Sequence, residues 1–120
     1  VARHMIGRER GKIINIASVA RSGNFGQSNY SAAKAGVSAM TVLWAQELAQ
    51  YGIRVAGIAP GFTATEMVVS LRDDIKEKFT NSIPLRRFAE TSEMSDGALF
   101  ILKNEYYTGR MLEIDGGARI

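Results

Sequence analysis

The alternation of short β-branched runs with a long helical pattern is the feature that most limits how this chain can fold. Residues 12–17 (KIINIA) and 53–59 (IRVAGIA) are short apolar runs rich in isoleucine and valine, which is typical of buried strands. Between them, residues 28–50 repeat apolar side chains at three- and four-residue spacing, and Gly52 offers a helix stop. Two strands separated by a helix are expected to pair in parallel through a right-handed crossover. The sequence therefore predicts an α/β fold.

The remaining segments complete this scheme. Gly11 is expected to end a first helical segment, and Thr91 is expected to cap the N-terminus of the last helix. Residues 64–82 are charged and amphipathic, and they predict one or two short helices. The further elements expected are a helix end over residues 1–10, a connector over 83–88, a helix over 91–103 and a third strand over 110–114.

Composition excludes several classes of protein. At 120 residues, 46% of them hydrophobic, the chain is long enough for one compact unit at most. It has no cysteine and one isolated histidine, so neither disulfides nor a metal site are expected, and a cytoplasmic location fits. No apolar run approaches the roughly 20 residues that span a membrane, and no signal peptide is recognisable at the start. The net charge of +3, without aromatic residues interleaved among the basic ones, argues against nucleic-acid binding.

A tyrosine and a lysine four residues apart open the long predicted helix. One helical turn would place the Tyr30 phenol and the Lys34 ammonium on the same face. A free tyrosine titrates near ~10, and a fixed cation beside it favours the phenolate and lowers that pKa. Ser18, just after the first strand, can donate a hydrogen bond to the same substrate oxygen. The three side chains could pass a proton to a carbonyl oxygen as hydride arrives, although this spacing alone is more often an ordinary helix turn.

The predicted topology brings these residues together with a proline–glycine pair. In open parallel sheets, ligands bind at the carboxyl ends of the strands. Ser18 follows the first strand, Pro60 and Gly61 end the second, and Tyr30 and Lys34 begin the helix between them. We therefore expect one site at this edge of the sheet.

Four segments, taken in order, resemble the short-chain dehydrogenase/reductase family: NIAS, GQSNYSAAKAGV, IRVAGIAPGFTATEM and GRMLEIDGG. The resemblance runs from Gly11 to Gly117 and is greatest to the bacterial 3-oxoacyl-[acyl-carrier-protein] reductase group. It implies the C-terminal half of a Rossmann-like doubly wound parallel sheet, with three strands and intervening helices in a single partial domain over 1–120. The family's N-terminal phosphate loop, its N-N-A-G segment and its catalytic asparagine are not in this sequence. The GNFG of residues 23–26 is no substitute, because it does not join a strand directly to a helix.

The resemblance implies a role for each matching position. Tyr30 would be the general acid/base, Ser18 would polarise the carbonyl, and Lys34 would lower the tyrosine pKa and bind the nicotinamide ribose. For Thr63 and Thr65, capping of the next helix is an alternative or additional role. The interval from Ser18 to Tyr30 is one residue shorter than expected for this group, which bears on substrate contacts. The implied cofactor-binding positions are Tyr30, Lys34, Pro60, Gly61, Thr63 and Thr65.

The resemblance also implies how the rest of the chain is used. Residues 64–88 would form a mobile substrate lid. Met67, Val68, Val69 and Leu71 are expected to pack this lid, and contact with the substrate is the alternative for them. Asn29, Ala33 and Gly36 would be packing positions, and Trp44 would pack in the core or at a subunit contact. Arg21, Arg86 and Arg87 could attract an acidic carrier protein or a phosphopantetheine arm, or simply be exposed solubilising residues.

The implied reaction is the NAD(P)-dependent reduction of a carbonyl to a secondary alcohol. A 3-oxoacyl thioester is the favoured substrate and NADP the favoured cofactor. Fatty acid biosynthesis, an acyl carrier protein partner and a homotetrameric complete enzyme are further implications. Another secondary-alcohol, sugar or steroid dehydrogenase remains an alternative, as does a non-catalytic module or inactive fragment that retains the fold.

Overall fold

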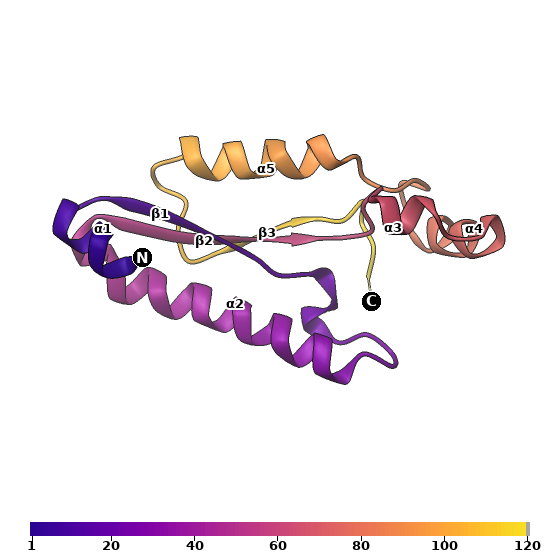
Figure 1. Ribbon diagram of the computed structural model, residues 1–120, viewed down its shortest axis with the longest axis horizontal. Helices are drawn as coiled ribbons and strands as arrows, with labels where there is room; N and C mark the ends of the chain where they lie inside the picture. Colours follow the sequence, from indigo (N-terminus) through magenta and orange to yellow (C-terminus); the bar gives the residue numbers. More distant parts are fainter. Residues whose placement is uncertain (120) are drawn as a thin grey trace.

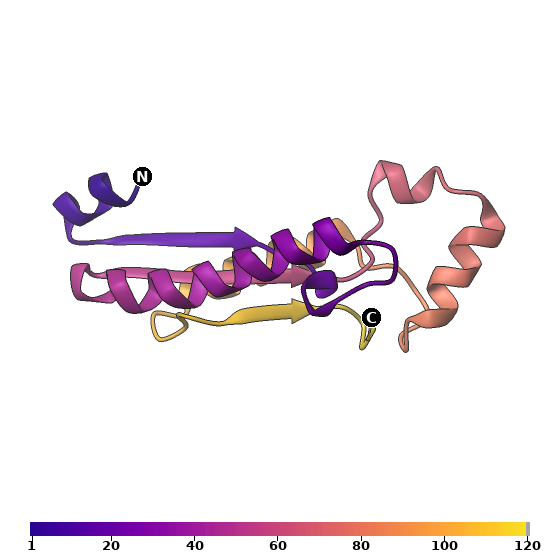
Figure 2. The same ribbon diagram turned by 90° about the horizontal axis from the view of Figure 1, so that it is seen from below.

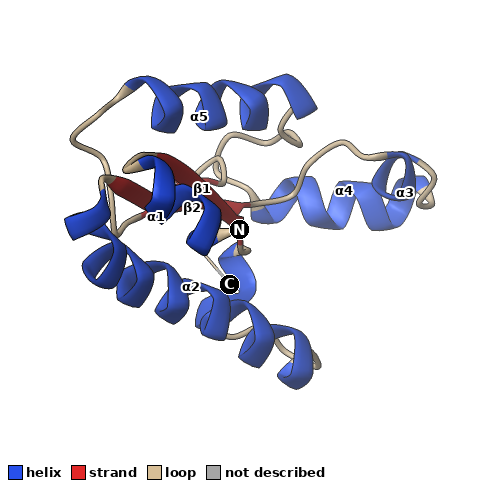
Figure 3. Ribbon diagram, turned by 60° about the vertical axis from the view of Figure 1, so that its left-hand side comes forward, coloured by secondary structure: helices blue, strands red, loops and turns tan. Residues whose placement is uncertain are grey.

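The computed structural model describes residues 1–119, and its centre is a three-stranded parallel sheet with helices on both faces (Figure 1). The strand order is β1 (Gly11–Ile16), β2 (Ile53–Pro60), β3 (Met111–Ile114), and both neighbouring pairs are parallel. The long helix α2 (Ser28–Leu48) covers one face and α5 (Thr91–Lys103) covers the other (Figure 3). This arrangement confirms the predicted doubly wound α/β fold class.

The central strand β2 is buried on both faces, which explains its almost uninterrupted apolar sequence. Because successive side chains in a strand point to opposite faces, β2 contributes to two separate hydrophobic clusters. Val55 packs with Ala45 of α2 on one face. Ala56 and Ile58 pack with Ile101 of α5 on the other. Trp44 is partly buried and packs against the first cluster, so the contact with the core, one of the two alternatives predicted for it, is found.

The helix boundaries follow the backbone conformation of single residues. As predicted, Gly52 ends the α2 region: it adopts a left-handed φ of 71° after the short 3₁₀ turn η2 (Ala49–Tyr51). The prediction that Gly11 ends the first helix is wrong. Helix α1 (Ala2–Arg8) ends when Glu9 turns into the left-handed region, with φ 54°, and Gly11 is already the first residue of β1.

Helix α5 is capped one residue earlier than predicted. Thr91 is its first helical residue, and Glu90 occupies the N-cap position. The Glu90 side chain accepts a hydrogen bond from the backbone of Glu93, and the Glu93 carboxylate accepts one from the Glu90 N–H at 2.8 Å. This reciprocal pairing is a capping box with glutamate at both positions.

Residues 64–88 project from one end of the sheet (Figure 2). They contain two short helices, as the sequence allowed, α3 (Glu66–Val69) and α4 (Asp73–Ser82). A parallel bridge between Thr63 and Ala89 closes their base, and backbone hydrogen bonds of 2.8 and 2.9 Å tie Ala89 to the chain on either side of Thr63. The projection explains a radius of gyration of 16.0 Å, where about 14 Å is expected for a compact domain of this length.

Candidate active site

A cleft of about 590 Å³ opens where β1 and β2 end. Its size is typical of small-ligand sites, and its place is the one at which open α/β sheets bind ligands. The lining also includes apolar side chains from the segment after β2 and from α5. Six sequence-predicted positions line the cleft: Ser18, Tyr30, Pro60, Gly61, Thr63 and Thr65.

Tyr30 and Lys34 lie on the same face of α2, as the four-residue spacing predicts. The Lys34 ammonium nitrogen is 5.7 Å from the centroid of the Tyr30 ring, within the range of a cation–π contact. It also donates a hydrogen bond of 3.0 Å to the carbonyl oxygen of Ile16, the last residue of β1. Lys34 therefore sits beside the cleft, between the strand end and the ring. The Tyr30 side chain is about half exposed and lines the cleft.

Ser18 lies directly beyond β1 in an extended conformation, with φ −164° and ψ 156°. Its hydroxyl oxygen accepts a hydrogen bond from the backbone N–H of Ala20 at 3.1 Å and so caps the 3₁₀ turn η1 (Val19–Ser22). A serine hydroxyl has one donor and two acceptor positions. The capping bond uses one acceptor position, so the hydroxyl proton remains able to point at an oxygen in the cleft.

A buried hydrogen-bond chain fixes α2 against β1. The Asn15 side-chain amide donates to the Thr41 hydroxyl at 2.9 Å, and that hydroxyl donates to the carbonyl of Val37 at 2.8 Å. Thr41 is completely buried, so these bonds replace contacts with water that it has lost. Because β1 leads to Ser18 and Tyr30 lies in the first turn of α2, this contact helps set the relative position of the two hydroxyl groups. The sequence signal for this hydrogen bond is an asparagine inside a β-branched strand, and the predicted site did not include it.

Gly61 is required by packing against the end of β3. A β-carbon at this position would lie 2.7 Å from the Asp115 Cα, closer than real contacts allow. The Gly61 N–H donates to the carbonyl of Ile114 at 2.9 Å. Thr63 donates to the carbonyl of Gly61 at 3.2 Å, whereas Thr65 occupies the N-cap position of α3 without a capping bond from its side chain. The capping role considered for Thr65 is therefore not realised, and Thr65 remains a residue of the cleft wall.

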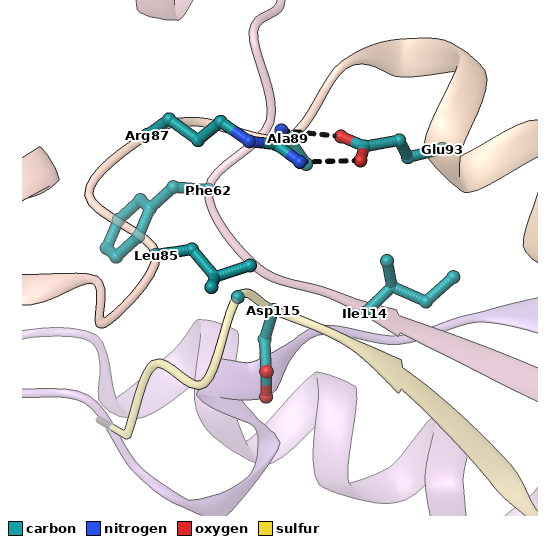
Figure 4. Close-up of a pocket in the computed structure, with 8 residues that line it drawn as sticks. Phe62, Leu85, Arg87, Ala89, Glu93, Ile114 and Asp115 are labelled. Atoms are coloured by element: carbon teal, nitrogen blue, oxygen red, sulfur yellow. Dashed lines mark hydrogen bonds and ion pairs between the residues drawn. The ribbon is translucent and has the colours of Figure 1, made fainter.

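An ion pair lies beside the cleft, across a smaller pocket of about 100 Å³ that Phe62 also lines (Figure 4). Two nitrogens of the Arg87 guanidinium donate to the two carboxylate oxygens of Glu93, each at 2.8 Å. These bonds, with help from the Glu90 backbone N–H, lower the pKa of Glu93 to about 2. The pair joins the connector after α4 to the first turn of α5, at the base of residues 64–88.

The three arginines considered for carrier attraction or solubility are each engaged within the chain. Arg21 forms an ion pair with Glu113. Arg86 donates to the carbonyl of Asn81 at 2.6 Å. Arg87 is bound to Glu93 as well. Arg86 and Arg87 are nevertheless exposed, so both the carrier and the solubilising alternatives stay predictions.

The packing roles expected for Asn29, Ala33 and Gly36 are not found among residues 1–119. Asn29 and Ala33 are exposed, and a β-carbon at Gly36 would meet no other atom within 4 Å. Met67 and Val69 likewise do not pack the projecting segment, since 76% and 57% of their surfaces are exposed. The apolar pattern of α2 predicted the helix correctly, but its apolar residues lie on more than one face.

Sequence reasoning missed part of the cleft wall. Asn24 and Gln27 lie in the connection between Ser18 and Tyr30, and their place in that loop was a usable signal. Met94 comes from α5, on the far side of the projecting segment, and nothing in its sequence neighbourhood marks it. Met67 and Val68, for which the sequence left substrate contact open, also line the cleft. The lining residues that were not predicted as site positions are Val19, Ala20, Asn24, Gln27, Phe62 and Met94.

Two other kinds of function find no support in the part of the chain that the structure describes. No helix within residues 1–119 has the length and apolar character needed to cross a membrane. No group of three or more histidine, cysteine, aspartate or glutamate side chains in the same range is placed to hold a metal ion.

Comparison with known proteins identifies relatives along the whole described chain. Residues 1–119 match the family model described as enoyl-(acyl carrier protein) reductase. The chain is 44% identical over 116 residues to the acetoacetyl-CoA reductase of Synechocystis sp., covering 93% of this chain and 48% of that protein. It is also 44% identical over 120 residues to the 3-oxoacyl-[acyl-carrier-protein] reductase of Thermotoga maritima, covering 98% and 49%.

A solved structure shows the same fold. The crystal structure of 3-hydroxyacyl-CoA dehydrogenase type-2 from Mycobacterium avium superposes with a TM-score of 0.94 at 35% identity, covering 99% of this chain and 49% of that one. The chain thus spans about half the length of the relatives that it matches. On the family match, these identities and this superposition, the chain belongs to the short-chain dehydrogenase/reductase family.

Proposed function

We propose that this chain carries the catalytic residues of an NAD(P)-dependent reductase that converts the ketone of a 3-oxoacyl thioester to a secondary alcohol. One observation carries the proposal. Ser18 and Tyr30 line a single cleft at the carboxyl ends of the strands, and the Lys34 ammonium lies 5.7 Å from the Tyr30 ring centroid. Hydroxyl groups from two separate elements, with a cation beside one of them, are the parts needed to protonate a carbonyl oxygen.

The reaction divides between these three side chains. The chemistry that a bound nicotinamide cofactor would supply is transfer of a hydride to the carbonyl carbon. As the electron pair of the C=O bond moves to oxygen, the Tyr30 hydroxyl gives its proton to that oxygen and becomes a phenolate. The Lys34 ammonium stabilises the negative charge by its proximity. Ser18 donates a hydrogen bond to the same oxygen and fixes its position, while its own oxygen remains bonded to the Ala20 N–H.

The wall formed by residues 60–65 fits the nicotinamide end of the cofactor. Pro60 and Gly61 provide a flat apolar surface at the end of β2, and the hydroxyls of Thr63 and Thr65 lie in the same cleft wall. These residues would hold the nicotinamide ring and the groups next to it. The sequence contains no strand, glycine-rich loop and helix in succession for the pyrophosphate. The preference for NADP over NAD rests on resemblance.

The substrate class follows from the relatives and not from the cleft alone. Proteins named acetoacetyl-CoA reductase and 3-oxoacyl-[acyl-carrier-protein] reductase both act on a ketone in a thioester. A 3-hydroxyacyl-CoA dehydrogenase would run the same chemistry in the oxidative direction, which makes it the second candidate. The family description names an enoyl reductase, and reduction of a carbon–carbon double bond is the contrasting reaction to test.

Three further features belong to the same proposal. Residues 64–88 act as a lid over the cleft, hinged at the bridge between Thr63 and Ala89. The complete enzyme is a cytoplasmic homo-oligomer, a homotetramer by resemblance. It accepts its substrate as a small molecule or as the thioester of an acyl carrier protein, in fatty acid biosynthesis.

Replacement of the tyrosine tests the proposal. In the complete native protein, Tyr30→Phe removes the proton donor and leaves the ring, so kcat for an acetoacetyl thioester should fall by about 10²- to 10⁴-fold. Tyr51→Phe is the matched control, because Tyr51 lies at the other end of the α2 region and outside the cleft. The loss of reduced nicotinamide absorbance follows the reaction. Unchanged turnover in Tyr30→Phe, or reduction of a crotonyl thioester in place of the acetoacetyl thioester, would refute the assignment.

A further inference from the structure

A second cleft adjoins the candidate active site, on the other side of Phe62 and Asn24. It measures about 450 Å³ and lies between the loop before α2, helix α4 and the C-terminal segment. Asn24 and Phe62 line both clefts, so the two share a wall. We call this space, lined also by Phe25, Phe79, Lys78 and Arg119, the outer cleft.

Three phenylalanines, Phe25, Phe62 and Phe79, line the outer cleft. Phe62 and Phe79 are in contact, with ring centroids 5.0 Å apart. Phe25, at the tip of the loop, is fully exposed to solvent. A phenylalanine left entirely in water forgoes the stabilisation that burial of its ring would give. A bound molecule that covers Phe25 would recover part of that free energy.

The charged side chains that line the outer cleft are both basic. Lys78 and Arg119 line it, and no carboxylate among the described residues does, although the Arg119 guanidinium is paired with Asp115 at 3.5 Å. Lys78 differs from other basic residues of the projecting segment. Lys76 pairs with Asp73 at 3.5 Å, whereas within residues 1–119 Lys78 has no ion-pair partner. A cation beside an aromatic wall, with no acidic partner of its own, suits a ligand that is partly apolar and carries an anion.

We propose that the outer cleft binds the phosphate-bearing pantetheine arm of the thioester substrate, with Lys78 as the residue that contacts the phosphate. The inference rests on the proposed function, in which the ketone of the 3-oxoacyl chain lies at Ser18 and Tyr30 and the thioester leads away from it. The arm passes the shared wall of Phe62 and Asn24 and packs its apolar part against Phe25 and Phe79. The same arm occurs in coenzyme A and on acyl carrier proteins, so the chemistry recognised is common to both sources.

A binding measurement with the pantetheine arm alone tests this proposal without any turnover. Isothermal titration of the complete native protein would compare 4′-phosphopantetheine with pantetheine, which differ by one phosphate. We expect the phosphorylated arm to bind about fivefold more tightly, the size of an exposed ion pair, and the ratio to shrink as salt is added. Lys78→Gln should bring the ratio close to one. Lys76→Gln, two residues earlier on the same helix, should preserve it.

The possible results of these titrations either overturn the proposal or identify the source of the arm. Equal binding of the two arms, no binding of either, or a preference that survives Lys78→Gln with unchanged circular dichroism would overturn the proposal. Coenzyme A that binds more tightly than phosphopantetheine supports a free coenzyme as the source of the arm. Equal binding of coenzyme A and phosphopantetheine supports recognition of the arm that both molecules share. Turnover of acetoacetyl-N-acetylcysteamine, a thioester without phosphate, by the unmodified protein tests the proposed function separately.

Discussion

Two glycines near the candidate site serve opposite structural purposes. Gly61 lies beneath the end of β3, where a β-carbon would come within 2.7 Å of the Asp115 backbone. Gly36 lies in the middle of α2, where a β-carbon would meet no atom of another part of the chain within 4 Å. Glycine is therefore required for packing at the first position and costs helix stability at the second.

Alanine substitutions at these glycines should change the free energy of unfolding in opposite directions. Gly61→Ala forces β3 away from the cleft wall and should lower it by about 1–3 kcal/mol, the usual cost of overpacking. Gly36→Ala should raise it by about 0.5–1 kcal/mol through better helix propensity. Urea denaturation of the two variants measures both effects. A Gly61→Ala protein as stable as the unmodified one would show that β3 can move without cost.

At the scale of elements, the projecting segment is held by contacts at its base. The bridge between Thr63 and Ala89 brings its two ends together, and the Arg87–Glu93 ion pair ties it to α5. Both partners of that pair are substantially solvent-exposed, so we expect a modest contribution to overall stability. Its larger effect is local, because it fixes the connector that carries α4 relative to the cleft.

The Arg87–Glu93 contact should weaken in acid. The pKa of Glu93 is lowered to about 2 from 4.5, so its contribution to stability is complete above pH 4.5 and is lost as the pH falls toward 2. In Arg87→Ala, the carboxyl resonance of Glu93 should titrate at a higher pH, although below 4.5 because the Glu90 N–H bond remains. Hydrogen exchange in α3 and α4 should rise in the same variant.

Arg72→Ala is the control for this prediction. Arg72 pairs with Asp74 on the surface at 3.3 Å, with both side chains largely exposed, and it does not contact Glu93. Its removal should leave the Glu93 titration unchanged. If Arg87→Ala also left that titration unchanged, the ion pair would not be the cause of the low pKa.

At the scale of the whole molecule, both outer strands of the sheet, β1 and β3, pair on one side only within residues 1–119, and β1 is the longer of the two. Within residues 1–119, β1 pairs only with β2, and more than half of the Ile16 surface is exposed. An apolar cleft of about 460 Å³ lies beside the same strand, between α1 and the Trp44 region of α2. Unpaired strand edges and exposed apolar surface favour association with other chains.

A polypeptide consisting of residues 1–120 alone should bind dinucleotide poorly and should associate. The expected results are a weak NADPH signal in calorimetric titration, no measurable reduction of acetoacetyl thioester, and a sedimentation coefficient that increases with protein concentration. The physical reasons are the missing pyrophosphate contacts and the open edge of β1. A stoichiometric NADPH titration with turnover, by a monomer, would contradict this prediction.

Local patterns in the sequence determined the elements and their order. The β-branched runs, the three- and four-residue spacing of α2 and the stop at Gly52 each depend on neighbouring residues alone, so strands and helices could be predicted from them. The parallel pairing followed from the alternation of these elements. The spacing of Tyr30 and Lys34 also placed both on one face of a helix. Predicted cap positions were less accurate, because Glu90 and Glu93 cap α5 through a pairing that propensity alone does not reveal.

Only the tertiary structure decided which residues from distant segments meet. It placed Met94 in the cleft wall from beyond the projecting segment, and it tied Asn15 to Thr41 beneath the site. It also paired Arg87 with Glu93, a contact that the sequence did not indicate. Such contacts depend on the path of the whole chain in space, whereas helices, strands and turn residues depend on interactions between neighbours. The sequence by itself therefore determined the fold class and the chemistry available, and the tertiary structure determined the shape of the cleft that uses it.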